Sequence, residues 1–365
     1  MNISKQYKCF CLMDVSMRAS FLLLLLPSLS YSFISGKNDM FNRLPFRGGC
    51  SDITRKMIDP MRLYDSAPKM WNFLSFALKD RARGWFIDRA EKKGIKWYDL
   101  LKSYSDNFDK IKEIYDDKTN TSMVYPKYYT RPFHGYDDGN LNWLAAFEGD
   151  AATLSMASGY WNGVDPFTTA SWLRFNITNN IQHYMKQHRA REPVTILDVG
   201  SSVGISTEYL YRGFKSCEKA AGIDLSPYFV AVATYRAEKG GLPFYYYHQN
   251  AEDPYINQTF DTIVFTYILH EVPREETRIM IDRMKSLLRP NGVMAIVDLD
   301  PDKLKSSLLL SKFRKWAFEV TEPHVYEYYN TNLSDILKEK GFVNVEKVSN
   351  DPINSIWMGQ LTNKD

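Results

Sequence analysis

The stretch from residue 194 to residue 207 constrains this chain more than any other. It opens with six residues that are apolar at all but two positions, and a run this short and rich in β-branched side chains predicts a buried parallel strand. A loop containing Gly200 and Gly204 follows, and Ser206 is expected to cap a helix that ends at Phe214. A strand, a glycine loop and a helix in this order present backbone N–H groups to a ligand at the carboxyl end of a parallel sheet.

The residues of this loop distinguish between classes of ligand. A dinucleotide site requires Gly-x-Gly-x-x-Gly, but Ser202 and Ile205 stand where the second and third glycines would be. A P-loop requires Gly-Lys-Ser/Thr, which the stretch lacks. Asp198 lies two residues before Gly200, and a carboxylate there would repel a pyrophosphate but suits the cationic end of a ligand. The alternative is a glycine-containing turn that binds no ligand.

Asp198, Gly200, Ser202 and Gly204 resemble the first motif of the class I S-adenosylmethionine (SAM)-dependent methyltransferases. In that motif an acid is followed by three glycines at alternate positions, and Ser202 replaces the middle one. The resemblance implies an α/β, Rossmann-like fold with a seven-stranded class I methyltransferase sheet and an N-terminal helical cap. It also implies SAM as the cofactor, with these residues around its methionyl half.

Strands and helices are expected to alternate after this stretch, as in other α/β folds. Two late apolar segments have no helix between them, which predicts an antiparallel pair at one edge of the sheet. With five strands of the parallel type, this pair makes seven. The expected strands are 194–199, 220–223, 244–248, 262–265, 293–297, 343–348 and 356–361, and the helices include 227–239 and 274–288, with residues 301–340 mostly helical.

Polar residues at the strand ends complete the expected cofactor site. Asp224 ends the second strand, and a carboxylate there can accept hydrogen bonds from both ribose hydroxyls, as in Rossmann sites. The resemblance places three residues after the third strand beside the adenine, although the family often has Asp at the first of them. It places one residue after the fourth strand near the sulfonium. The additional cofactor residues are Leu225, Asn250, Ala251, Glu252 and Thr266.

Other segments resemble a narrower subgroup. Residues 270–271, 287–292 and 321–328 are similar to methyltransferases close to the quinone-biosynthesis enzymes, which occur in cyanobacteria and plastids. Residues 131–143 are similar to the segment that precedes the SAM domain of these proteins. The substrate suggested is a quinone-like or other lipid-like ring, and a small sulfur or nitrogen metabolite is the alternative.

Methyl transfer is an in-line displacement at a sulfonium carbon, so the enzyme mainly aligns the reactants and excludes water. An oxygen, nitrogen or acidic carbon acceptor also loses a proton, whereas a thiolate or thioether loses little or none. His270 is the candidate base and Glu271 its candidate partner, although a purely structural role for either is the alternative. The candidate walls of the acceptor pocket, each with a structural alternative, are Tyr136, Tyr267, His324 and Tyr326.

The N-terminal residues resemble a targeting sequence. Arg18 precedes a leucine-rich run and then small residues, which is typical of a signal peptide and too short to span a bilayer. The weakly basic stretch from Phe33 resembles the second part of an algal plastid presequence, and plain secretion is the alternative. The expected organisation is a presequence over 1–50, a helical N-terminal region and cap over 51–190, and a SAM-dependent methyltransferase domain over 191–365.

The helical region is expected to contain amphipathic helices over 71–78 and 97–115, and helices over 141–156 and 168–188 that lead into the sheet. Between them, residues 125–143 mix aromatic and polar groups with Pro and Gly, which predicts an irregular loop that caps a ligand. A structural loop is the alternative.

Composition limits the remaining function classes. The 365 residues carry a formal charge of +3 and no basic arm, so nucleic acid is not an expected partner. The four cysteines form no disulfide or zinc pattern, and no metal site is predicted. The prediction is a methyltransferase acting on a small molecule, without a stable membrane span, and the oligomeric state is left open. A SAM-fold protein without catalysis is the alternative.

Overall fold

The computed structural model describes residues 83–131, 136, 138–158, 160–161, 163–306, 322 and 324–362. The expected presequence over residues 1–50 and the expected helix over residues 71–78 lie outside these ranges. Among the described helices, none is long and apolar enough to cross a membrane.

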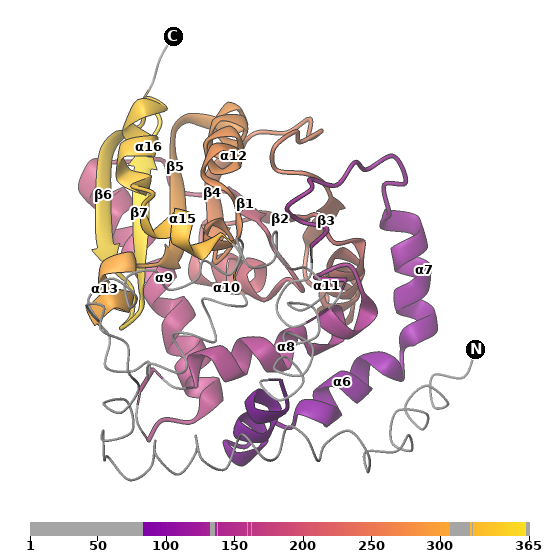
Figure 1. Ribbon diagram of the computed structural model, residues 1–365. Helices are drawn as coiled ribbons and strands as arrows, with labels where there is room; N and C mark the ends of the chain where they lie inside the picture. The colour runs from indigo at the N-terminus through magenta and orange to yellow at the C-terminus, as the bar shows by residue number, and fades with distance from the viewer. Residues whose placement is uncertain are drawn as a thin grey trace, which may run out of the picture. The chain divides into compact units, whose positions relative to one another are not determined.

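A seven-stranded sheet forms the centre of the described chain, in the order β3-β2-β1-β4-β5-β7-β6 (Figure 1). β1 to β5 pair in parallel, and β7 pairs antiparallel with both β5 and β6. This order confirms the expected class I methyltransferase sheet with its antiparallel pair at one edge. The strands are β1 Thr195–Val199, β2 Lys219–Asp224, β3 Phe244–His248, β4 Phe260–Thr266, β5 Leu288–Leu299, β6 Val343–Ser349 and β7 Asn354–Gln360.

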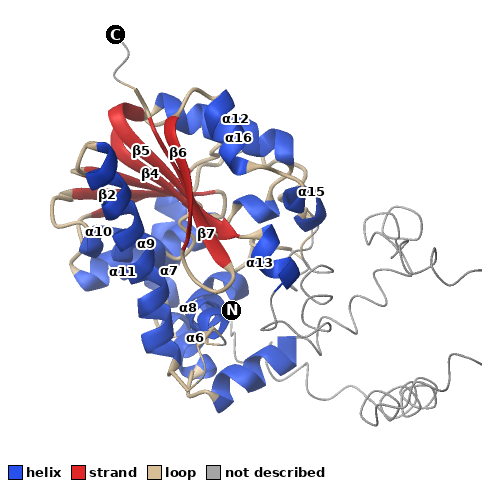
Figure 2. Ribbon diagram, turned by 90° about the vertical axis from the view of Figure 1, so that its left-hand side faces the viewer, coloured by secondary structure: helices blue, strands red, loops and turns tan. Residues whose placement is uncertain are grey.

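Helices cover both faces of this sheet (Figure 2). Side chains alternate along each strand, so Ile196 packs with α9 and α10 on one face while Leu197 packs with α12 and α16 on the other. Both are fully buried, as expected for a parallel sheet between two helical layers. The helices from β1 onward are α10 Ile205–Gly213, α11 Pro227–Gly240, η2 Leu269–Glu271, α12 Arg274–Ser286, α13 Pro301–Ser306, α15 Val325–Tyr329 and α16 Leu333–Glu339.

The described part of the N-terminal region, from residue 83 onward, is largely helical, as expected. A helix over 83–92 is followed by α6 Trp97–Ser105, α7 Phe108–Lys118, α8 Trp143–Ala157 and α9 Pro166–His188. The amphipathic helical segment expected over 97–115 forms two helices, α6 and α7, with a break between them. Asp106 and Asn107 lie at the break, where the Asn107 amide donates to the Ser103 carbonyl and so competes with helical hydrogen bonding.

The helix expected over 274–288 ends earlier, at Ser286, because β5 already begins at Leu288. Residues 301–340 contain α13, α15 and α16 as separate short helices among the described residues. The described part of residues 125–142 contains turns and one isolated bridge, which confirms the prediction of an irregular loop.

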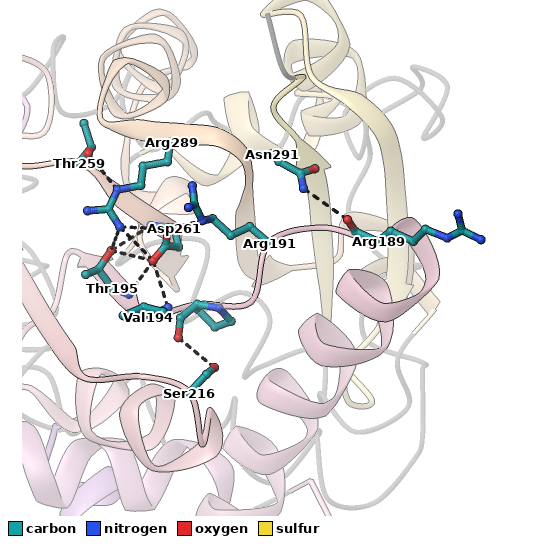
Figure 3. A network of polar contacts seen from close by, with 10 residues as sticks. Arg189, Arg191, Val194, Thr195, Ser216, Thr259, Asp261, Arg289 and Asn291 are labelled. Atoms are coloured by element: carbon teal, nitrogen blue, oxygen red, sulfur yellow. Dashed lines mark hydrogen bonds and ion pairs between the residues drawn. The ribbon is translucent and has the colours of Figure 1, made fainter.

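A buried carboxylate holds the amino-terminal ends of β1 and β4 together (Figure 3). Asp261 accepts hydrogen bonds from the backbone N–H of Val194 at 3.0 Å and of Thr195 at 2.9 Å. It also pairs with Arg289 at 3.0 Å and Arg191 at 3.1 Å. The network fixes the strand register at the end of the sheet opposite the glycine loop, and no local pattern in the sequence predicted it.

Candidate cofactor and active site

Three residues of the loop after β1 have left-handed backbone conformations. The φ angles are 70° at Gly200, 48° at Ser202 and 83° at Gly204. A side chain at Gly200 would begin 2.4 Å from Ile268, and one at Gly204 would begin 2.4 Å from the Tyr246 hydroxyl. Glycine is therefore required at both positions for two reasons, whereas Ser202 tolerates the left-handed region at some cost.

Asp198 lies beneath this loop and is fully buried. Its Oδ2 atom accepts hydrogen bonds from the Ser206 hydroxyl at 2.6 Å and the Thr207 hydroxyl at 2.7 Å, and Oδ1 lies 3.5 Å from the Thr266 hydroxyl. The expectation that Ser206 caps the helix was wrong, since Gly204 is the N-cap of α10 and Ser206 bonds Asp198 instead. Burial raises the pKa of Asp198 to about 6, against the opposing effect of these hydroxyls.

Asp224 joins the end of β2 to the glycine loop. Its Oδ2 atom accepts the Ser202 N–H and its Oδ1 atom accepts the Ser226 N–H, both at 2.8 Å. The neighbouring Leu225 carbonyl lies 2.9 Å from Nε2 of His248. Burial raises the pKa of Asp224 to about 7, and the two backbone N–H groups oppose this shift. Asp224 is 8% exposed, so part of the residue remains accessible at the border of the site.

The residues after β3 contact the segment before α8. The Asn250 side-chain oxygen accepts the Glu252 N–H at 2.9 Å, and Ala251 between them is buried. The Tyr128 hydroxyl donates to the Glu252 carboxylate, 124 positions away in sequence. Burial raises the pKa of the Tyr129 phenol well above its usual value, and the charge of Asp224 raises it further. These two tyrosines were not predicted, although they lie in the segment that was expected to cap a ligand.

His270 follows β4 and is paired with a carboxylate from β5. Its Nδ1 atom lies 2.7 Å from Oδ1 of Asp298, and its ring is 9% exposed. Burial by itself would lower the pKa of His270, but the charge of Asp298 and its hydrogen bond, with help from Glu271 and Glu322, raise it to about 9. The sequence placed Asp298 after the fifth strand but assigned it no role.

Glu271 and Glu322 complete an acidic cluster around this imidazole. One atom from each of His270, Glu271 and Glu322 lies within 4.8 Å of the others, a spacing compatible with a cation. An imidazolium among carboxylates accounts for the same arrangement, because its ring supplies the positive charge at that point. We therefore interpret the two carboxylates as partners of the protonated His270 ring.

Tyr267, the residue after β4, has a left-handed backbone with φ 59°, which is strained for an aromatic residue. Its N–H donates to the Val297 carbonyl at 2.8 Å, so the neighbouring strand holds this conformation. Its hydroxyl is buried and has no hydrogen-bond partner among the described residues. Strain and an unpaired hydroxyl at a strand end are both typical of a ligand site.

The other three residues expected to line the acceptor pocket lie in different surroundings from one another. The Tyr136 hydroxyl donates to Glu148 on α8, so its polar contact is with the N-terminal helices. The His324 ring packs edge-on against Tyr128 at 6.0 Å, and burial, with the charge of Arg131, lowers its pKa. Tyr326 contacts Tyr329 and is 39% exposed. His324 thus joins the segment around Tyr128, whereas Tyr136 does not.

The predicted cofactor residues therefore meet at one edge of the sheet. They lie in or directly after β1, β2, β3 and β4, whose carboxyl ends share that edge because the strands are parallel. Asp298 on β5 brings His270 to the same edge. The ligand roles of all these residues remain predictions.

Comparison with known proteins agrees with this geometry. Residues 174–347 match the family model described as "Methyltransferase domain". The ubiquinone biosynthesis O-methyltransferase of Paramagnetospirillum magneticum is 30% identical over 156 residues, covering 39% of this chain and 59% of the relative. The protein of the same name from Actinobacillus pleuropneumoniae is 34% identical over 105 residues, covering 27% of this chain and 43% of the relative. The chain thus matches about half the length of these curated relatives.

Among solved structures, an O-methyltransferase family protein from Burkholderia thailandensis is 15% identical with a TM-score of 0.45, over 73% of this chain and 71% of that one. The matched domain, the strand order and the glycine loop are sufficient to assign the class I methyltransferase fold. Residues 174–347 therefore form a methyltransferase domain of the class I, SAM-dependent type.

Proposed function

We propose that this protein transfers a methyl group from SAM to an oxygen of a small, ring-containing acceptor. The observation that carries the proposal is Asp224, whose buried carboxylate is joined to the left-handed loop at Ser202. SAM supplies an electrophilic methyl group on its sulfonium. The chain's own residues bind SAM and the acceptor, orient them towards each other and exclude water.

The residues present fit the parts of SAM. Each Asp224 oxygen accepts one backbone N–H, and a carboxylate has about four acceptor positions, so two remain for the ribose hydroxyls. Residues 200–204 would hold the methionyl half, and residues 250–252 would lie beside the adenine. Tyr128 and Tyr129, which contact Glu252 and lie near Asp224, would close this part of the site from water.

His270 would act on the acceptor. With a pKa of about 9, only ~1% of its rings are neutral at pH 7, so the prevailing form is a hydrogen-bond donor. Such a donor stabilises negative charge on an acceptor oxygen, and the neutral ring would remove a proton at higher pH. An acidic hydroxyl, as on a quinol-type ring, suits this pair of roles. The names of the curated O-methyltransferases support an oxygen acceptor.

The proposal includes a plastid location, which rests on the sequence of residues 1–50 alone. Import of the full chain fused to a fluorescent protein would test it. Fluorescence confined to the secretory pathway or the medium would contradict it.

Methyl transfer is tested with SAM labelled at its methyl group. The full chain and its Asp224→Ala variant are each incubated with a small-molecule extract, and labelled products are separated by mass. We expect one labelled product that carries the label on oxygen and disappears with the variant. SAM that binds in calorimetry without any labelled product would favour the non-catalytic alternative. Label on sulfur or nitrogen would contradict the oxygen acceptor.

A further inference from the structure

A groove separate from the cofactor residues lies among the helices of the N-terminal region and the first two helices of the sheet domain. It has a volume of about 430 Å³ and is lined by residues of α6, α8, α9, α10 and α11. None of the described residues that line it belongs to the predicted SAM site. One face of α10 faces it, from Ile205 in the first turn to Arg212 in the last.

The charges in the groove do not balance. Arg236 pairs with Asp150 at 2.6 Å, and Arg212 pairs with Glu208 at 2.9 Å. Arg174 also lines the groove, but it has no carboxylate partner within 4 Å among the described residues. The groove therefore has three guanidinium groups and two carboxylates, which leaves one positive charge in excess.

Arg174 is the least exposed of the three arginines, at 6%. Among the described residues, its guanidinium donates one hydrogen bond, to the Ala170 carbonyl of its own helix, at 3.2 Å. Its guanidinium lies 5.3 Å from the centre of the Tyr209 ring, and the Tyr209 hydroxyl is held by Ser171 at 3.2 Å. The guanidinium is thus held in position, while most of its five N–H groups have no acceptor in the part of the chain that the structure describes, which is costly for a buried charge.

Asp198 does not pair with Arg174 and so does not neutralise its charge. The Asp198 oxygens accept hydrogen bonds from Ser206, Thr207 and Thr266, and no ion pair joins it to Arg174. Tyr267, the residue after β4, packs against the apolar cluster of Ala170 and Leu173 on α9, and Ala170 also lines the groove. The groove is therefore next to the strand ends at which methyl transfer is proposed, and there the charge of Arg174 opposes the rise in the pKa of Asp198 that burial causes.

The remaining lining favours a ligand with an apolar body. Leu100, Leu154, Phe167 and Ile205 line the groove together with Arg174. An apolar surface beside one unpaired guanidinium matches an organic acid, because a carboxylate can bond the planar guanidinium through two parallel hydrogen bonds.

We propose that this groove binds the carboxylate of the methyl acceptor, with Arg174 as its anchor and the apolar body of the acid along Phe167 and Ile205. The assignment to the acceptor rests on the proposed methyltransferase function. The class of acceptor is thereby narrowed to organic acids, while the oxygen that receives the methyl group lies at the strand ends near His270.

The test compares benzoate with benzamide, which has the same shape but no charge, by calorimetry on the full chain. We expect benzoate to bind at least about tenfold more tightly. Arg174→Gln should abolish this difference, Arg174→Lys should retain part of it, and all three proteins should bind SAM within about twofold of one another. Loss of one charge-assisted hydrogen bond corresponds to a weakening of about 10- to 150-fold.

Arg212→Gln is the matched control. It removes a positive charge from the same groove, but its side chain is 60% exposed and is paired with Glu208. We expect it to keep the preference for benzoate within about twofold of the unsubstituted protein. An equal effect of the two glutamine variants would overturn the proposal. It would indicate that benzoate responds to the overall positive charge of the groove and not to a direct contact with Arg174.

The comparison of benzoate with benzamide needs no variant, so it stands even if Arg174→Gln fails to fold. Equal binding of the two probes, or no binding of either, overturns the proposal. Arg174→Gln that weakens SAM and leaves benzoate unchanged would assign the arginine to the methionyl carboxylate and also overturn it. Failure of the unsubstituted protein to bind SAM would contradict the proposed function and leave the benzoate result independent.

Discussion

Nδ1 of His270 lies 2.7 Å from Oδ1 of Asp298, and Oδ2 of the same carboxylate accepts the Leu269 N–H at 2.8 Å. One side chain from β5 therefore fixes both the turn after β4 and the orientation of the imidazole. The pair explains why burial does not leave His270 neutral. The compensating charge lies within hydrogen-bond distance, so the positive form of the ring is stabilised.

The first prediction concerns the pH dependence of methyl transfer. If the neutral ring of His270 takes a proton, the rate should rise with pH up to about 9, above the range of an ordinary histidine. Asp298→Asn should move this limb to lower pH, because it removes the carboxylate that stabilises the charged ring. Measurement of kcat from pH 6 to 10 for both proteins checks the shift.

His270→Ala should lower kcat by roughly 10²- to 10⁴-fold if an oxygen acceptor is deprotonated in the reaction, while SAM binding persists. A folded variant with a nearly normal kcat and no pH limb would end the assignment and favour a sulfur acceptor. Circular dichroism and SAM calorimetry serve as the controls for folding.

The second prediction concerns Asp224. Asp224→Ala removes the expected ribose contact and also the acceptor for the Ser202 N–H, so the loop loses one of its supports. SAM affinity should fall by about 10- to 150-fold, which corresponds to about 1.5–3 kcal/mol. Calorimetry with SAM measures it, and Asp253→Ala, in the turn after β3, is the control. Unchanged affinity in a folded Asp224→Ala protein would show that the ribose site is misplaced.

The third prediction separates two positions of the same loop. Ser202→Gly should leave SAM affinity within about twofold, because the backbone N–H of Ser202 makes the bond to Asp224 and glycine adopts φ 48° without strain. Gly200→Ala should weaken SAM binding and lower Tm, because its methyl group would start 2.4 Å from Ile268 at φ 70°. Thermal melts with and without SAM check both variants, and equal behaviour of the two would contradict this account of the loop.

The fourth prediction concerns stability and Asp261. Burial by itself would raise the pKa of this carboxyl, but hydrogen bonds from the Thr195 backbone N–H and from Arg289 hold it below its usual range. Its contribution to stability is therefore present above the unfolded pKa of about 3.9 and is lost as pH falls through the folded value. Asp261→Asn should lower the free energy of unfolding by about 2–4 kcal/mol at pH 7, and by less as the pH falls below 4.

Urea unfolding at a series of pH values measures this difference. Asp282→Asn, on the exposed face of α12 and paired with Lys340, is the control and should cost less than about 0.5 kcal/mol. A loss at Asp261 that is independent of pH would show that packing, and not charge, accounts for its role.

Local patterns in the sequence were enough to predict the strands, the glycine loop and the acids beside it. These features depend on local patterns: a buried parallel strand reads as a short apolar run, and a left-handed turn requires glycine within a few residues. For the same reason Asp198, Asp224 and the closing antiparallel pair were placed correctly, and the class of fold followed from their order.

Which side chains meet depends on how distant elements of the chain pack. Ser206 has the local features of a helix cap, yet it bonds Asp198, because the buried carboxylate beneath α10 needs a donor. Asp298 meets His270 because β4 and β5 are neighbours, and Tyr128 reaches Glu252 across 124 positions. Arg174 looks like any helical arginine in sequence, and only the packing of five helices around the groove shows that no described carboxylate pairs with it. Contacts of this kind depend on how distant elements pack, and no local pattern of residues specifies that packing.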